Sequence, residues 1–260
     1  MQDGKALQAG TSHDLGQNFA KAFDIKFQDK DGKLSHVWQT SWGVTTRLIG
    51  ALIMMHGDDK GIIVPPKIAP VQVVIVPIYK TDEDKEKVYS KAQEIKDKLK
   101  NVRVKFDDRD QLKPGRKFYE WEKKGVPVRL ELGPRDIAQD KVMMVNRVTS
   151  KKESLETDKF CKNIEEILVK IQSDLFNKAK EFCKNNTFHL DDYDEFKKQV
   201  EEKGGFFYLH WCGSPDCETK VKEDTKATIR CIPHDEVKKE GRCICCEAKS
   251  EQRVVFAKSY

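Results

Sequence analysis

Long hydrophobic runs are missing from this sequence. The longest apolar stretch, residues 62–78, is interrupted by prolines and by Lys67, so we expect no membrane-spanning helix. Near the start, no basic stretch is followed by an apolar one, and we therefore expect no signal peptide and a cytoplasmic location. The sequence also lacks internal repeats and low-complexity tracts.

A strong excess of one charge is lacking as well. The 260 residues include 48 Lys and Arg against 43 Asp and Glu, which gives a formal net charge of +5. This excess permits a nucleic-acid partner without demanding one, and on charge alone a solvated lysine-rich surface is the simpler explanation. The length suits one large domain or two to three small ones.

The hydrophobic pattern divides the chain into three predicted domains, at residues 1–68, 69–152 and 153–260. In the first, residues 45–59 have the pattern of a helix that is apolar nearly all round, and we expect this helix to be buried. The proline-rich stretch 65–70 marks the boundary to the second domain, because the residue before a proline is disfavoured in a helix.

The second predicted domain has the pattern of an α/β layer. Residues 71–78 form a β-branched run typical of a strand buried on both faces, and residues 82–100 form an amphipathic helix. Alternating strands and helices favour a mostly parallel sheet with right-handed crossovers. In the third domain a long helix precedes a strand that leads into a cysteine cluster, which predicts a small α+β domain.

Six of the eight cysteines fall between Cys212 and Cys246. Cys212 with Cys217, and Cys243 with Cys246, form two close pairs whose spacing suits a tetrahedral structural zinc. Cys245 is an alternative to Cys246 that the spacing leaves open. Four thiolate ligands leave no open coordination position, so catalysis by this metal is not expected. We interpret the remaining cysteines as packing residues: Cys161, Cys183 and Cys231.

Two polar stretches stand in apolar surroundings near the start, QAGTSH at 8–13 and TSWGVTTR at 40–47. Arg47 opens an apolar helix, where an arginine and backbone donors suit a phosphate. Thr45 is equally explained as a helix N-cap, and His13 as a structural histidine. The residues by themselves therefore indicate a possible nucleotide pocket and go no further.

Several stretches together resemble the prolyl-tRNA synthetases of the archaeal and eukaryotic-like type, which carry an extra C-terminal zinc-binding domain. The resemblance covers essentially the whole chain, and SWGVTTRLIG…HGDDKG…PP is similar to the third signature motif of class II synthetases. The stretches that carry it are ALQAGTSHDLGQNFAKAFDIKF, SWGVTTRLIGALIMMHGDDKGIIVPPKIAPVQVVIVPI, DDR, PGRKFYEWEKKGVPVRLELGPRD and FAKSY.

The resemblance implies an overall α+β organisation of three parts. Residues 1–68 would be part of the antiparallel class II catalytic sheet, residues 69–152 an α/β anticodon-binding domain, and residues 153–260 the zinc-binding domain. The implied reaction is the ATP-dependent activation of proline, with Mg accompanying ATP as substrate, and transfer of the prolyl group to tRNA(Pro). The full-length enzyme would be a homodimer without a membrane partner.

The resemblance also implies roles for single residues. Catalysis in such enzymes rests mostly on positioning and on electrostatic stabilisation of phosphate charge, so no residue is expected to be a covalent catalyst. The C-terminal carboxylate, on Tyr260, would reach towards the active site. The implied contacts are Gln8, Thr11, Thr45 and Arg47 for ATP; His13, Ser41 and Gly43 for proline; Glu122 and Arg129 for the guanines of the anticodon; and Arg135 and Lys151 for its bases or phosphates.

In the family, the first two class II motifs precede the stretch that corresponds to QAGTSH, and this sequence has no counterpart for them. We therefore expect the chain to be inactive by itself as a proline–tRNA ligase, although the parent protein would have that activity. The alternative is a module that binds tRNA(Pro) without catalysis.

Overall fold

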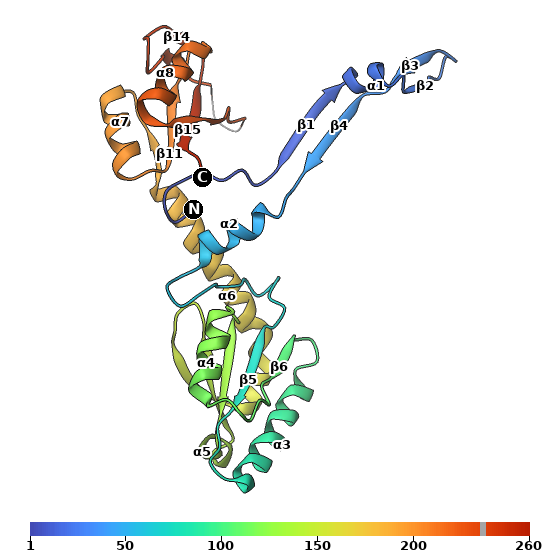
Figure 1. Cartoon of the computed structure of the whole chain (residues 1–260), viewed down its shortest axis with the longest axis vertical. Helices are drawn as coiled ribbons and strands as arrows, with labels where there is room; N and C mark the ends of the chain where they lie inside the picture. Colours follow the sequence, from blue (N-terminus) through green and yellow to red (C-terminus); the bar gives the residue numbers. More distant parts are fainter. Residues whose placement is uncertain (235–237) are drawn as a thin grey trace. The chain divides into compact units, whose positions relative to one another are not determined.

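The computed structural model describes residues 1–234 and 238–260. It contains two compact units, one formed by residues 52–185 and the other by residues 1–51 together with residues 186–260 (Figure 1). No helix in the described ranges has the length and apolar character needed to cross a membrane.

A five-stranded sheet with the strand order β6-β5-β7-β8-β9 organises residues 52–185. The sheet is mixed, and the prediction of a mostly parallel sheet is wrong: β5 pairs in parallel with β6 and β7, whereas β8 pairs antiparallel with β7 and β9. The segment joining β7 to β8 is too short for the crossover that a parallel neighbour requires. The strands are β5 (Val73–Pro77), β6 (Val104–Phe106), β7 (Val128–Leu132), β8 (Lys141–Asn146) and β9 (Lys152–Glu156).

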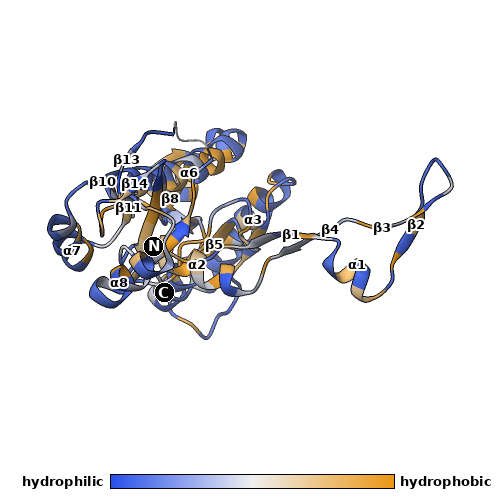
Figure 2. Ribbon diagram, turned by 90° about the horizontal axis from the view of Figure 1, so that it is seen from above, coloured by the Kyte–Doolittle hydropathy of each residue, from blue (hydrophilic) through white to orange (hydrophobic). Residues whose placement is uncertain are grey.

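Helices cover both faces of this sheet. Every residue of β5 is buried, as its β-branched pattern predicted. Val73 and Ile75 pack with helices α3 and α6, while Val74 and Val76 pack with Trp121 of helix α4, and the apolar strands appear orange in Figure 2. The helices are α3 (Asp82–Lys98), α4 (Pro114–Lys123), the short α5 (Pro134–Ala138) and α6 (Thr157–Asn185).

Helix α6 is part of the unit formed by residues 52–185. Its residues Phe160, Ile164 and Leu168 belong to the same core cluster as strands β5 and β7. The unit therefore extends past the predicted domain boundary at residue 152, because the apolar face of α6 has its packing partner on the preceding sheet.

A four-stranded sheet with the order β10-β11-β15-β12 organises the second unit. Helices α7 and α8 pack on one face of it through Phe196, Val200 and Val221. Strands β13 and β14 form a separate small hairpin. The elements are β10 (Thr187–His189), α7 (Tyr193–Glu202), β11 (Phe206–His210), α8 (Pro215–Thr225), β12 (Ala227–Cys231), β13 (Gly241–Arg242), β14 (Lys249–Ser250) and β15 (Arg253–Lys258).

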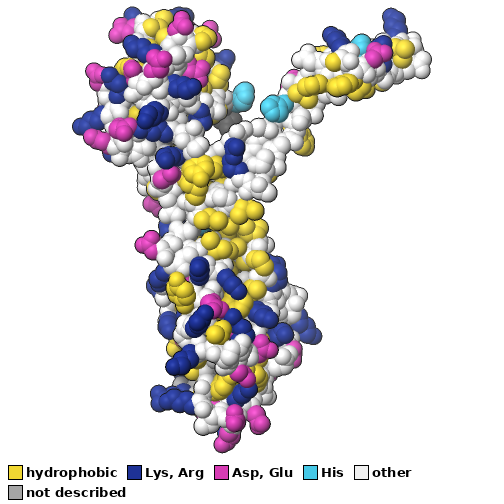
Figure 3. Space-filling view, viewed as in Figure 1, with side chains coloured by type: hydrophobic (Ala, Val, Ile, Leu, Met, Phe, Trp, Pro, Cys, Tyr) yellow, Lys and Arg dark blue, Asp and Glu magenta, His cyan; other side chains and the backbone are white. Residues whose placement is uncertain are grey.

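The first 51 residues contain a two-stranded antiparallel ribbon, β1 with β4, and a smaller hairpin, β2 with β3. Apolar side chains are exposed along this region, with Trp42 at 81% and Trp38 at 74% exposure, and yellow side chains mark it in Figure 3. The elements are β1 (Thr11–Gly16), α1 (Asn18–Ala22), β2 (Lys26–Gln28), β3 (Leu34–His36), β4 (Gln39–Gly43) and α2 (Arg47–His56).

Helix α2 differs from its prediction. We expected this apolar helix to be buried, but it contains no buried residue, and Ile49 is 61% exposed. Within the described part of the chain, no core cluster includes a residue of α2. Exposed apolar surface of this kind typically marks a contact face.

Candidate functional site

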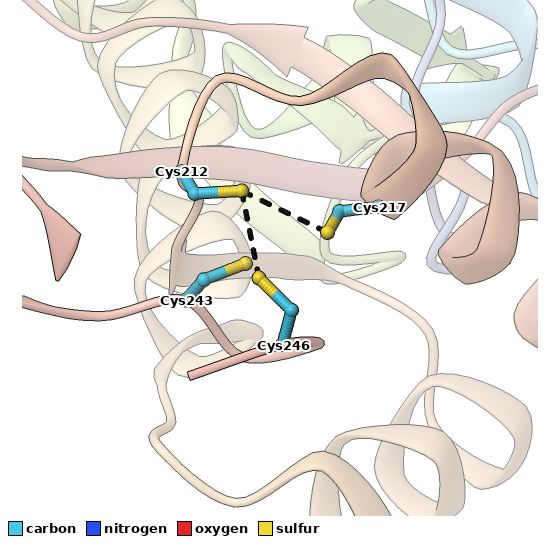
Figure 4. A group of neighbouring side chains, drawn as sticks. All are labelled: Cys212, Cys217, Cys243 and Cys246. Atoms are coloured by element: carbon cyan, nitrogen blue, oxygen red, sulfur yellow. Dashed lines mark hydrogen bonds between the residues drawn. The ribbon is translucent and has the colours of Figure 1, made fainter. Parts of the chain in front are cut away.

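Four cysteine thiols converge in the unit that contains the C-terminal residues. Cys212 follows β11, Cys217 lies in the first turn of α8, and Cys243 and Cys246 lie in the loop between β13 and β14. Their ligand atoms all lie within 4.8 Å of one another, and Figure 4 shows the sulfurs pointing into one common space. The close pairs predicted from the sequence are therefore brought together.

Local structure aims each pair of thiols. Gly213 adopts a positive φ of 86°, which favours glycine, and Ser214 caps helix α8 by accepting a hydrogen bond from the Asp216 N–H at 3.2 Å. In the second loop the Cys243 N–H donates to the Ala248 carbonyl at 2.8 Å. These two turns present the thiols from opposite sides.

The arrangement fits a tetrahedral metal. Cys212 Sγ lies 3.7 Å from both Cys217 Sγ and Cys246 Sγ. Sulfurs bound tetrahedrally at about 2.3 Å from a zinc ion would be about 3.8 Å apart. Burial raises the pKa of the Cys243 thiol, but backbone N–H donors, among them that of Cys245, outweigh this effect and bring the pKa to about 7. The residues present thus form a set of thiols that could hold a metal ion.

Cys245 lies outside this set in the structure. The cluster contains Cys246, whereas the partly buried Cys245 packs against the apolar core around Phe207. Cys231 also stands outside the cluster, but it is exposed, so its interpretation as a packing residue is wrong.

A second candidate site lies in residues 52–185, where Glu122 and Arg129 line one small hollow. Glu122 belongs to α4 and Arg129 to β7, so two neighbouring elements bring these predicted anticodon residues together. Val126, Asn146 and Arg147 also line the hollow.

Arg129 is held in place by partners that the sequence did not reveal. Its Nη2 donates to the buried Glu131 carboxylate at 3.0 Å, and its guanidinium lies 4.6 Å from the ring centroid of Phe118. Lys152 Nζ pairs with the same carboxylate at 3.0 Å. These contacts fix the plane of the Arg129 guanidinium group. Some of its five N–H donors remain available to a ligand.

The structure does not bring Arg135 to this hollow. Arg135 lies in α5, beyond the C-terminal end of β7, while the hollow adjoins Arg129 near the other end of the strand. Lys151 lies in the turn between β8 and β9, where its carbonyl accepts from the Asn146 N–H at 3.1 Å. Lys151 is therefore close to the hollow, because Asn146 is one of the lining residues.

Arg147 lines the hollow and braces it, although no pattern in the sequence indicated this role. This buried arginine donates to both carboxylate oxygens of Asp58, at 2.8 and 2.6 Å, and its Nε donates to the Glu122 carbonyl at 2.9 Å. These bonds hold the pKa of Asp58 down at about 2. Lys60 Nζ lies 3.3 Å from Glu122 Oε1, so the loop after α2 is tied to the end of α4.

A buried ionic network lies beside α4. The Asp107 carboxylate accepts from Arg109 Nη2 and from Trp121 Nε1, both at 2.7 Å. Lys117, only 2% exposed, donates to the Asp107 carbonyl at 3.0 Å, and burial lowers its pKa. Arg109 also reaches Glu120 at 2.8 Å. The network fixes the middle and end of α4 against the residues that follow β6.

The β1–β4 ribbon aligns the residues predicted to contact proline. Thr11 lies opposite Gly43, and His13 lies opposite Ser41. Because successive side chains alternate between the faces of a strand, these four positions share one face of the ribbon.

Three of the four residues predicted to contact ATP meet near the start of α2. Arg47 Nη1 donates to Gln8 Oε1 at 3.3 Å, and the Arg47 backbone N–H donates to Thr45 Oγ1 at 3.3 Å. The side chains of Gln8, Thr45 and Arg47 are exposed in this chain.

The C-terminal residue is anchored next to this region. Tyr260 donates its backbone N–H to the Ala6 carbonyl at 3.0 Å, and the Ala6 N–H donates to the Lys258 carbonyl at 2.9 Å. These bonds hold the C-terminal carboxylate near the segment that leads into Gln8.

Both candidate sites lie in regions of the chain that match known families. Residues 72–167 match the family model described as an anticodon binding domain, and residues 193–260 match the one described as prolyl-tRNA synthetase, C-terminal. The chain is 53% identical over 262 residues to the proline–tRNA ligase of Flavobacterium psychrophilum, and 54% identical over 270 residues to that of Chloroherpeton thalassium. Both alignments include 100% of the chain, and they cover 53% and 55% of these relatives.

A solved structure shows the same fold. The prolyl-tRNA synthetase of Cryptosporidium parvum, crystallised with halofuginone and AMPPNP, superposes with a TM-score of 0.90 and 38% identity. The match covers 99% of the chain and 55% of that protein. The chain thus spans about half the length of the relatives it matches.

Proposed function

The chain belongs to the prolyl-tRNA synthetase family, of which it carries the C-terminal region, and from this premise we propose that it supplies the part of the enzyme that reads the tRNA(Pro) anticodon. The whole enzyme would activate proline with ATP and Mg and transfer the prolyl group to tRNA(Pro), working as a homodimer. The observation that carries the proposal is the hollow shared by Glu122 and Arg129 in the region that matches the anticodon-binding model.

The chemistry of this hollow suits guanine. A carboxylate such as Glu122 accepts from the N1–H and N2 amine of guanine, and an arginine such as Arg129 donates to O6 and N7. Single-stranded loops expose these base edges for recognition. Lys151, in the adjoining turn, would approach a phosphate, whereas Arg135 lies outside the hollow.

Replacing Arg129 with alanine is expected to weaken binding of a tRNA(Pro) anticodon stem–loop by roughly 5- to 150-fold, since a bidentate arginine–base contact contributes about 1–3 kcal/mol. Fluorescence anisotropy with labelled RNA at fixed salt measures this change. Arg135→Ala is the matched control, because it removes the same charge at the opposite end of β7. Equal losses in the two variants would count against base reading at Arg129.

We propose that the N-terminal region forms one wall of the aminoacylation site. Gln8, Thr45 and Arg47 would contact ATP together with Thr11, and the paired positions of the ribbon would contact proline: His13, Ser41 and Gly43. The Tyr260 carboxylate would approach the same region, because the Ala6 bond anchors it there.

The 260-residue chain by itself is expected to show no proline-dependent exchange between ATP and pyrophosphate. Electrostatic stabilisation of phosphate charge requires donors in a site that excludes water, and the side chains of Arg47 and His13 are exposed in this chain. Radiolabelled pyrophosphate incorporation tests this. Exchange well above a blank without proline would contradict this expectation. Binding of tRNA without exchange favours the second candidate function, a tRNA(Pro)-binding module without catalysis.

We further propose that the cysteine cluster holds one structural zinc ion through Cys212, Cys217, Cys243 and Cys246. The 3.7 Å sulfur separations and the all-thiol donor set support this metal. When bound, zinc would tie α8 and the β13–β14 loop to the end of β11. These residues hold the ion and leave it no position for a substrate.

A further inference from the structure

A cluster of charged side chains lies on the face of the five-stranded sheet that packs against α4. Val74 packs with α4 and lies opposite Arg129 of β7. Val145 of β8 is paired with Arg129 on one side and with Lys152 of β9 on the other. Paired residues point to the same side of a sheet, and so do positions two apart on a strand. Arg129, Lys152 and Glu131 therefore share this face.

The Glu131 carboxylate is divided between the two cations. Its Oε1 accepts from Arg129 Nη2 at 3.0 Å and from Arg129 Nε at 3.3 Å. Its Oε2 accepts from Lys152 Nζ, also at 3.0 Å. The side chain of Glu131 is 9% exposed and that of Arg129 is 12% exposed, so solvent screens their attraction less than it would at the surface. Glu131 thus holds both cations in fixed positions.

Glu131 occupies one particular edge of the Arg129 guanidinium group. The Nε proton and the nearer Nη2 proton form its side edge, and both nitrogens donate to Glu131. The end edge is formed by protons of Nη1 and Nη2. Among the described residues, the only other recorded hydrogen bond of this group runs from Nη1 to the Phe118 carbonyl, and at 3.4 Å it is long. The end edge is therefore the one left for a bidentate contact with a ligand.

We propose that Glu131 is the positioning residue that makes Arg129 a reader of bases rather than of phosphates. The inference rests on the anticodon reading proposed above and assigns it a further residue. By occupying the side edge, Glu131 presents the end edge of Arg129 to the O6 and N7 atoms of a guanine. By pairing with Lys152, it keeps that ammonium from the RNA backbone, which a free lysine binds whatever the sequence.

Glu131→Met tests the inference, because it removes the charge and both acceptor oxygens but keeps an unbranched side chain of similar length. Dissociation constants are measured at several salt concentrations for a tRNA(Pro) anticodon stem–loop and for loops in which an anticodon guanine is replaced by adenine. The wild-type chain is expected to prefer guanine roughly 5- to 150-fold at one position, and Glu131→Met less than about 3-fold. The adenine loops should bind Glu131→Met more tightly than the wild type, with a salt slope steeper by about 0.7, because the released Lys152 meets a phosphate.

Two further variants separate positioning from a change of charge. Glu131→Met/Lys152→Met has the net charge of the wild-type chain and should still discriminate poorly, because the side edge of Arg129 stays unoccupied. Glu153→Met is the matched control. It removes an exposed carboxylate that lies opposite Met144, on the other face of the sheet, and should keep the full preference for guanine.

The inference is overturned if Glu131→Met prefers guanine as strongly as the wild type does, or if the double variant regains that preference. A loss of affinity by the same factor for guanine and adenine loops would also overturn it, because a residue needed only for folding has that effect. Failure of the anticodon reading itself has a different signature, since the wild-type chain would then bind guanine and adenine loops equally.

Discussion

Asp107→Ala is expected to destabilise the unit formed by residues 52–185 by about 3–5 kcal/mol. Removing one partner from a buried ionic network leaves the opposite charge, here that of Lys117, without compensation. Asp107 is 1% exposed and Lys117 2% exposed, so water cannot replace the lost carboxylate. Trp121 would also lose the acceptor of its ring N–H. A loss of this size is a large fraction of the stability of a typical domain.

Amide hydrogen exchange of strands β5 and β7 in the full chain measures this loss as a free energy of opening. The matched control is Asp108→Ala, which removes the neighbouring exposed carboxylate and is expected to change stability by less than about 0.5 kcal/mol. If the amides of β5 are equally protected from exchange in both variants, the Asp107 network does not stabilise this unit.

The same network gives a pH dependence with a definite sign. Burial alone would raise the pKa of Asp107, but donors from Arg109 and Trp121 outweigh it and bring the pKa down to about 2. The folded pKa lies below the unfolded value of about 3.9. The contribution of Asp107 is therefore complete above about pH 4 and is lost as the pH falls towards 2, and Asp107→Asn should flatten this part of the stability curve.

Replacing Cys212 and Cys217 together by serine is expected to remove the zinc, which elemental analysis should find at about one ion per wild-type chain. Because binding free energy at a structural zinc site is also folding free energy, the double variant should lose hydrogen-exchange protection in β11 and β15. A strong chelator should have the same effect on the wild-type chain.

Single cysteine variants test which thiols hold the metal. Cys231→Ser is a control, since Cys231 is exposed and lies outside the cluster. Cys245→Ser should keep the zinc, whereas Cys246→Ser should weaken zinc binding. This comparison decides whether Cys245 or Cys246 is the fourth ligand. Full zinc content in the double variant of Cys212 and Cys217 would contradict the assignment.

Features with a local pattern could be predicted from the sequence. The β-branched run gave strand β5, buried at every position, and the helical spacing of Val88, Ala92 and Ile95 gave the buried face of α3. The cysteine spacing likewise anticipated the cluster at its observed positions. In each case the information lies within one element or one turn.

Features that depend on distant partners could not be predicted in this way. The antiparallel pairing of β8 depends on the length of a connection rather than on the apolar pattern. Arg147 and Asp58 are 89 positions apart, and neither has a local signal for their pairing. The exposure of α2 was missed because an apolar pattern indicates a face that needs a partner, not whether the chain itself provides one.

The proposed function depends on guanine reading by the hollow between Glu122 and Arg129. It is tested most directly by the dissociation constants of the wild-type chain for anticodon stem–loops in which the anticodon guanines are replaced by adenine one at a time. We expect at least one of these replacements to weaken binding to the wild-type chain roughly 10-fold or more. The same replacement should change the affinity of the Arg129→Ala variant little. Equal affinity of the wild-type chain for all of these loops would contradict the claim.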